Sequence, residues 1–244
     1  MKRAGSTLRT TCLGIALGLL VACTAPARIH RYVHPSLLGT PDRPLPRSAL
    51  VLTSDVVVEG DPKRSAESSR LLAAGFAERA RVEVVEMPAL SGAERSALAE
   101  HRKLASSVSG AALGLVERTD LGWGQGEEWG RRARRFDATL GSGLAFLHER
   151  SGAEAIVVVE ARTRRVPHDL PWAIGMLEDA SFLRISVFDL DTGDLLWTGR
   201  RTCRSNSFWR GAVDLSDPGE VEVCLGQTMG RYPGIEEFQA LCPE

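Results

Sequence analysis

The chain has 244 residues, of which 43% are hydrophobic and 25% charged, with 30 basic and 31 acidic side chains. These proportions are ordinary for a globular protein and exclude disorder or a fibrous repeat as a description of the whole chain. The near balance of charge argues against a basic surface of the kind that binds nucleic acid, so no nucleic-acid partner is expected.

The first residues have the pattern of a secretory signal. Lys2, Arg3 and Arg9 form a positive amino-terminal region, and Cys12–Ala22 (CLGIALGLLVA) is a continuous apolar run. This run is shorter than the about 20 residues that a membrane-spanning helix needs, but it fits the hydrophobic part of a signal peptide. We therefore expect the amino-terminal segment to direct export.

The signal ends in Leu20-Val21-Ala22-Cys23, which resembles the lipobox of bacterial lipoproteins. In that family the cysteine thiol receives a diacylglycerol, and the peptide bond before it is then cut. The resemblance implies that residues 1–22 are removed and that Cys23 carries several acyl chains, which anchor stably. Thr24 follows the cysteine, which in lipoproteins indicates the outer membrane, with the domain facing the periplasm or the cell surface. The alternative is a plain secretory signal that leaves Cys23 as a free thiol.

Residues 23–47 are predicted to form a lipidated cysteine and an extended tether. Prolines stand at positions 26, 35, 41, 44 and 46, and each fixes its φ angle. A tether of this length could reach on the order of 80 Å when extended. The folded domain is then expected to span residues 48–244.

Three cysteines remain beyond Cys23, namely Cys203, Cys224 and Cys242. Because the periplasm is oxidising, we expect one disulfide with one thiol left over. The first choice is Cys224 with Cys242, since both lie on the carboxy-terminal helical stretch, and Cys203 with either remains open. No C-x-x-C pair exists and no histidine lies in the last 70 residues, so these cysteines predict neither a metal nor a cofactor.

From residue 48 onward, hydrophobic periodicity predicts alternating strands and helices. The strands are expected at 49–52 with 56–58, 82–85, 155–159, 181–190 and 195–198, and the helices at 62–79, 91–107, 140–147 and 218–232. The run at 155–159 is apolar at every position, which places it at the centre of a sheet covered on both faces. Asp191-Thr192-Gly193-Asp194 predicts a hairpin turn. The helix at 91–107 has few large apolar residues and is expected to be peripheral. This order predicts an α/β domain with a single mixed sheet and packed helices.

Two stretches of the domain have a recognisable form. Residues 144–159 read as a helix, then GAEA, then a strand, and residues 183–201 contain RISVFDLDTGDLLWTGR. Both resemble bacterial envelope lipoproteins related to the curli-secretion lipoprotein and to the lipoprotein activators of penicillin-binding proteins. In that group an outer-membrane lipid anchor holds a small α/β domain that binds protein partners. The resemblance implies a scaffold or regulator of an envelope assembly; it does not extend to residues 117–143.

The glycine-rich segment 117–143 carries the candidate partner-binding site. It places arginines beside tryptophans, a composition that interface hot spots favour. The alternative is a solvated helix face that uses Glu127 and Glu128 as ion-pair partners. The partner would be an envelope protein or a second copy of the chain. The candidate residues are Trp123, Trp129, Arg131, Arg132, Arg134 and Arg135.

No sequence motif for catalysis is present. The patterns G-x-S-x-G, S-x-x-K and H-E-x-x-H do not occur. The acidic turn at 189–194 lacks the calcium-loop spacing, because glycine falls at position 5 and Arg200 at position 12. We therefore predict a non-enzymatic protein without a catalytic residue, metal or cofactor. The alternative is a periplasmic lipoprotein that binds or hydrolyses cell-wall or glycan material, which predicts a deep cleft with two convergent carboxylates.

Overall fold

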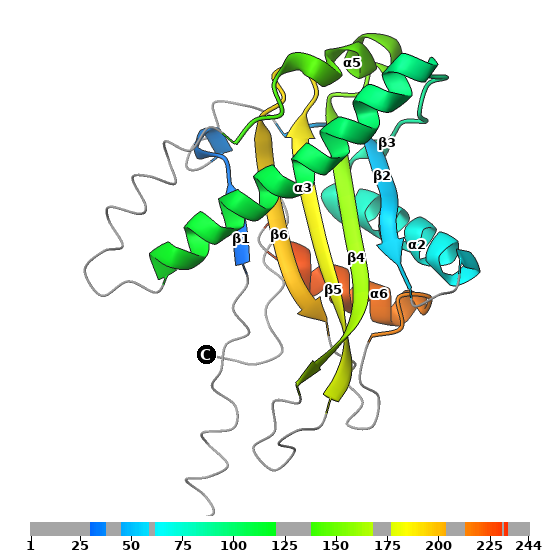
Figure 1. Ribbon diagram of the computed structural model, residues 1–244, viewed down its shortest axis with the longest axis vertical. Coiled ribbons are helices and arrows are strands. Elements are labelled where there is room, and N and C mark those ends of the chain that lie inside the picture. The colour runs from blue at the N-terminus through cyan, green and yellow to red at the C-terminus, as the bar shows by residue number, and fades with distance from the viewer. Residues whose placement is uncertain are drawn as a thin grey trace, which may run out of the picture.

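The computed structural model describes residues 30–37, 45–58, 62–120, 138–167, 177–203, 213–230 and 232–233. Within these ranges, six strands form one mixed sheet in the order β1-β6-β5-β4-β2-β3, and helices lie on both of its faces (Figure 1). The predicted α/β fold with a single mixed sheet is therefore confirmed.

From residue 48 onward, the elements follow the predicted order along the chain. The strands are β1 (His30–Val33), β2 (Ser48–Val57), β3 (Glu83–Val84), β4 (Ala155–Pro167), β5 (Leu177–Asp189) and β6 (Leu195–Cys203). The helices are α2 (Pro62–Ala80), α3 (Gly92–Asp120), α5 (Ala145–Ser151) and α6 (Pro218–Met229), with short 3-10 turns η1 (Pro35–Leu37) and η2 (Ser142–Leu144).

The apolar strand β4 lies inside the sheet, parallel to β2 and antiparallel to β5. Successive side chains of a strand point to opposite faces. Val157 and Val159 join the hydrophobic cluster under α2 and α6, whereas Ile156 and Val158 join the cluster under α3 and α5. The prediction of a central strand covered on both faces is confirmed.

The domain begins earlier in the chain than the sequence predicts. The sequence predicts that His30–Val33 belongs to a tether through residue 47. In the structure, these residues form β1, which pairs antiparallel with β6. The physical reason is that successive side chains of this segment enter the hydrophobic clusters on opposite faces of the sheet. Tyr32 is 5% exposed in the cluster under α3, and Val33 packs against the cluster on the other face. Pro35 then begins the turn η1 instead of stiffening a linker. The boundary at residue 48 is therefore wrong, and the sheet already includes residue 30.

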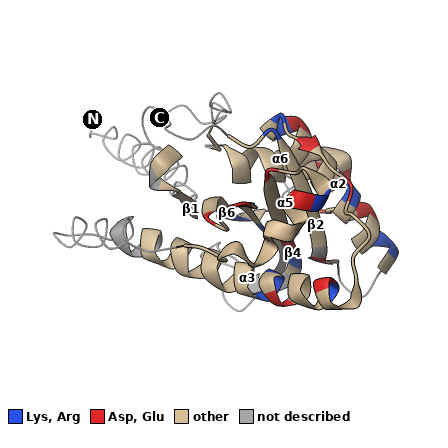
Figure 2. Cartoon of the chain, turned by 90° about the horizontal axis from the view of Figure 1, so that it is seen from above, with Lys and Arg blue, Asp and Glu red and all other residues tan. Residues whose placement is uncertain are grey.

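The helix α3 is longer and more central than expected. It runs over 29 residues and crosses one face of the sheet diagonally (Figure 1). Its buried side chains are mostly small, including Ala105, Ser109 and Ala112, so the helix backbone can approach the sheet closely. Residues 104–116 contain no charged side chain, and this part of α3 is accordingly tan in Figure 2. The expectation of a peripheral helix is wrong because small residues also build a close helix–sheet contact.

A disulfide joins the sheet to α6. Cys203, at the end of β6, bonds to Cys224 with a Cα–Cα distance of 5.5 Å, and both residues are fully buried. The first-choice pairing of Cys224 with Cys242 is wrong, and Cys242 lies outside the described residues. The physical reason is that α6 packs on the face of β6 toward which Cys203 points, which the sequence alone did not reveal.

Candidate functional site

Most residues of the sequence-predicted sites lie outside the part of the chain that the structure describes. The helix α3 ends at Asp120, just before the arginine- and tryptophan-rich segment. The structure therefore tests neither the predicted partner-binding site nor the predicted lipidation of the amino-terminal cysteine, and both stay predictions. The residues concerned are Cys23, Trp123, Trp129, Arg131, Arg132, Arg134 and Arg135.

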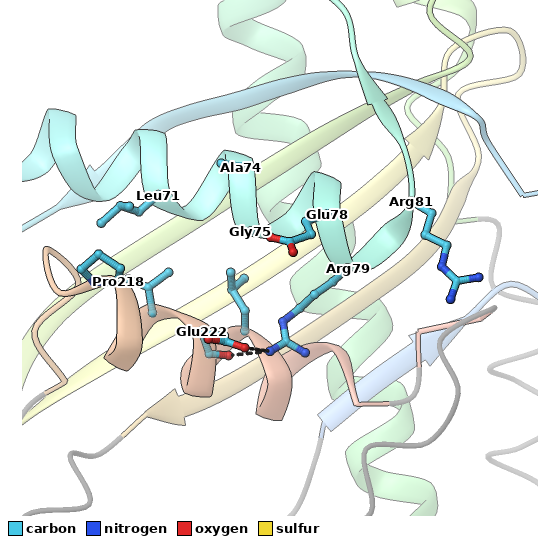
Figure 3. Close-up of a pocket in the computed structure, with 10 residues that line it drawn as sticks. Leu71, Ala74, Gly75, Glu78, Arg79, Arg81, Pro218 and Glu222 are labelled. Atoms are coloured by element: carbon cyan, nitrogen blue, oxygen red, sulfur yellow. Dashed lines mark hydrogen bonds and ion pairs between the residues drawn. The ribbon is translucent and has the colours of Figure 1, made fainter.

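A groove opens between α2 and α6, on the face of the sheet opposite α3 (Figure 3). Its volume is about 580 Å³, which lies in the range of small-molecule sites. The walls come from two helices that are far apart in the sequence. The apolar part of the lining consists of Leu71, Ala74, Gly75, Pro218, Val221 and Leu225.

The two helices approach closely because Gly75 has no side chain. A Cβ atom at this position would lie 2.5 Å from Cδ1 of Leu225. In the core next to Gly75, the ring of Phe76 packs edge-on against Tyr232 at 6.1 Å between centroids. Tyr232 in turn packs edge-on against Trp197 at 5.2 Å, and burial raises the pKa of Tyr232 to about 12. These three rings belong to the hydrophobic cluster that α2 and α6 cover.

Charged side chains form one end of the groove. Arg79 donates from Nη2 to the backbone oxygen of Glu222 at 3.1 Å and contacts the Glu222 carboxylate at 3.5 Å. Gly226 lets the guanidinium lie against α6, since a Cβ there would come within 3.2 Å of Nη2. Glu78 and Arg81 lie at the same end (Figure 3). The groove thus combines an apolar lining with a charged rim.

The two carboxylates that line the groove are Glu78 and Glu222. Arg79 engages the Glu222 carboxylate, whose side chain is 75% exposed. The Glu222 carboxylate is therefore already engaged by an ion pair. Within the described ranges, no group of three or more His, Cys, Asp or Glu side chains is placed to hold a metal ion.

The acidic turn between β5 and β6 forms the predicted hairpin. The Asp189 carboxylate accepts hydrogen bonds from the backbone N–H of Asp191 at 2.9 Å and of Thr192 at 2.8 Å. Gly193 follows with φ at 79°. The carboxylate at position 189 is therefore used to shape the turn, as the sequence favoured over a calcium loop.

A second polar cluster lies where β1 meets β6, on the face that α6 covers. Trp197, Gly199 and Arg201 alternate on this face of β6, and Cys203 continues the row to the disulfide. Arg31 of β1 is the register partner of Gly199. The indole of Trp197 lies over Gly199, with Cη2 2.6 Å from the place of a Cβ. We call Arg31, Trp197 and Arg201 the β1–β6 donor cluster.

Two nitrogens of the donor cluster are buried without an acceptor. Nε of Arg201 and Nε1 of Trp197 have no hydrogen-bond partner among the described residues. Burial lowers the pKa of Arg201, with no contribution from an acidic neighbour. A buried donor that lacks an acceptor costs about 1–3 kcal/mol. Arg31 contributes a second guanidinium to the donor cluster. It has interactions of its own within the protein, and its Nη1 atom is also buried.

An arginine on the opposite face of the sheet shows the contrast. Arg184, under α3, pairs with the carboxylate of Glu160 on the neighbouring strand. It also donates to the hydroxyl of Ser106 at 2.5 Å. The fold thus supplies Arg184 with acceptors from its own chain, whereas Nε of Arg201 has none among the described residues.

No family model matches the chain, and no curated protein matches it. Two solved structures align with it, a PelC dodecamer from Paraburkholderia phytofirmans and a single-residue variant of that dodecamer in a second crystal form. Each is 13% identical, covers 82% of this chain and 96% of its own, and gives a TM-score of 0.34. This similarity assigns neither a family nor a function.

A membrane-spanning helix needs about 20 consecutive, predominantly apolar residues. The helices among the described residues can be judged by this requirement. None of them has both the length and the apolar composition to cross a bilayer.

Proposed function

We propose that this protein is a non-enzymatic, lipid-anchored component of the bacterial envelope that scaffolds or regulates an assembly by binding a protein partner. The observation that carries the proposal is the lipobox-like Leu20-Val21-Ala22-Cys23, followed seven residues later by the first strand of the domain, β1. The resemblance to envelope lipoproteins of the curli-secretion group supports the same role.

The position of β1 limits the distance between the proposed anchor and the domain. An extended chain spans at most about 3.6 Å per residue. The seven residues from Cys23 to His30 therefore span no more than about 25 Å. An acylated Cys23 would hold the domain close to the outer membrane, instead of the roughly 80 Å that a tether through residue 47 could reach. This geometry favours a partner that itself lies at the membrane.

The α2–α6 groove supports partner binding. Its apolar lining and charged rim suit a protein segment that inserts apolar side chains between polar flanks. The alternative function, binding or hydrolysis of glycan material, needs two convergent carboxylates, whereas Arg79 engages Glu222 in this groove. The sequence-predicted segment from Trp123 to Arg135 remains a second proposed surface, for an envelope protein or a second copy of the chain.

Metabolic labelling with palmitate tests the anchor. The wild-type chain is expected to incorporate label and to fractionate with the outer membrane, whereas Cys23→Ala should do neither. Absence of label in the wild type, or unchanged membrane fractionation of Cys23→Ala, would refute the proposed anchor.

Filling the groove tests partner binding. Ala74 is exposed and lines the groove, so Ala74→Trp would fill it without entering the core. We expect this variant to lose its cross-linked partner in intact cells, as read by mass spectrometry, with an unchanged melting temperature. Ala99→Trp, at an exposed position of α3, is the matched control and should keep the partner. If Ala74→Trp captures the same partner as the wild type, the groove is not the binding surface.

A further inference from the structure

We propose that the β1–β6 donor cluster binds the phosphate group of an anionic membrane lipid. The cluster brings two guanidinium groups and an indole N–H to one face of the sheet, beside the place where the chain enters the domain. The choice of a lipid rests on the proposed anchor at Cys23, because that anchor would place this edge of the domain next to the headgroups.

The members of the cluster are held in fixed positions. Arg201 lies two residues before Cys203, whose disulfide ties β6 to α6. Trp197 is 1% exposed, packs edge-on against Tyr232 and covers Gly199. Arg31 reaches the same face through its register with Gly199. The donors are therefore organised before any ligand arrives, which lowers the entropy cost of binding.

The chemistry of the cluster fits a phosphate. A guanidinium presents parallel N–H donors whose spacing matches two oxygens of a phosphate. Nε of Arg201 and Nε1 of Trp197 are buried and lack an acceptor among the described residues. Phosphate oxygens would supply those acceptors, and their charge would balance the guanidinium of Arg201. Arg184 on the other face already has acceptors from its own chain, the Glu160 carboxylate and the Ser106 hydroxyl.

The position of the cluster favours a lipid as the source of the phosphate. His30 pairs with Arg200, the neighbour of Arg201, so the segment that leads back to Cys23 leaves the domain beside the cluster. With Cys23 acylated, this edge would stay within about 25 Å of the bilayer surface. Free phosphate offers the same chemistry, so the experiment must distinguish binding of a lipid headgroup from binding of free phosphate.

Vesicle binding by a chain without the acyl group tests the proposal. The mature chain carrying Cys23→Ala is floated with vesicles of phosphatidylcholine, with or without phosphatidylglycerol. We expect binding to the vesicles that contain phosphatidylglycerol, and about tenfold weaker binding by Arg201→Gln. Arg201→Lys, which keeps the charge but loses the paired donors, should be intermediate. Arg70→Gln, an exposed arginine of α2, is the matched control and should bind as before.

Two further measurements separate a binding role from a structural one. Trp197→Phe keeps a buried aromatic ring but removes the N–H, and it should weaken vesicle binding severalfold while its near-ultraviolet circular dichroism shows a folded domain. Inorganic phosphate should compete only weakly with the vesicles.

The outcomes that would overturn the proposal are distinct. Equal vesicle binding by the parent chain and Arg201→Gln would exclude the cluster, and binding of inorganic phosphate without binding of vesicles would exclude the lipid. Because this assay uses no acylated protein, its failure is separate from a failure of palmitate labelling, which concerns only the anchor.

Discussion

Removal of the disulfide between Cys203 and Cys224 should lower stability by a predictable amount. The two cysteines are 21 residues apart in the sequence. In the chain-entropy model, closing a loop of this length removes about 11 cal/mol/K from the unfolded state, which is about 3 kcal/mol at 25 °C. For a domain of this size, that loss corresponds to a melting temperature about 6–12 °C lower.

The variant for this measurement is Cys203→Ala with Cys224→Ala, followed by thermal and urea unfolding with and without reductant. The wild type should lose the same stability when it is reduced, and the double variant should not respond to reductant. Cys242→Ser is the matched control and should unfold like the wild type, because Cys242 is outside the observed bond.

Two results would contradict this reasoning. If Cys242→Ser lost the stability and the double variant did not, the carboxy-terminal cysteine would be the partner of the buried thiol after all. If reductant left the wild type unchanged, the bond would not constrain the unfolded chain.

Three further predictions concern single residues. The backbone N–H of Ser91 and the Arg150 guanidinium lower the pKa of Glu94 from 4.5 to about 2. The stabilisation from this carboxylate is therefore present above the unfolded pKa and lost as the pH falls toward 2. Urea midpoints should show Glu94→Gln below the wild type at about pH 6, with the difference shrinking as the pH falls through 2; a constant difference would contradict the assignment. Gly114→Ala, where a Cβ meets nothing within 4 Å, should raise the free energy of unfolding by about 0.5–1 kcal/mol. Gly193→Ala should lower it by about 2 kcal/mol, because φ is 79° and the Cβ would lie 2.2 Å from a backbone oxygen. Thermal melts that rank the two glycine variants the other way would refute this comparison.

The elements predicted correctly are those with a local signal. The unbroken apolar run of β4 predicted its central place in the sheet. Asp217 accepts from the backbone N–H of Gly219 at 2.8 Å and so caps α6, the helix that was expected to begin at residue 218. In each case the residues that decide the structure are neighbours in the sequence.

The features that the sequence did not reveal depend on distant pairing. The strand β1 is four residues long and lies among prolines, and its stability comes from β6 and the two hydrophobic clusters. The donor cluster unites Arg31 with Arg201 only through the register of those strands. The pairing of Cys203 with Cys224 likewise depends on which face of the sheet α6 covers. A single sequence carries no local signal for any of these contacts.

For a chain exported as proposed above, the place of β1 in the sheet would also set the order in which its strands can pair. Among the described strands β1 pairs with β6 alone, and β6 ends at Cys203. A chain that crosses the inner membrane amino terminus first delivers β1 early and its pairing partner late. The strand β1 would therefore stay unpaired until most of the polypeptide has crossed the membrane. The unpaired backbone groups of such a strand can associate with other chains. We expect a periplasmic chaperone to protect this segment until β6 emerges.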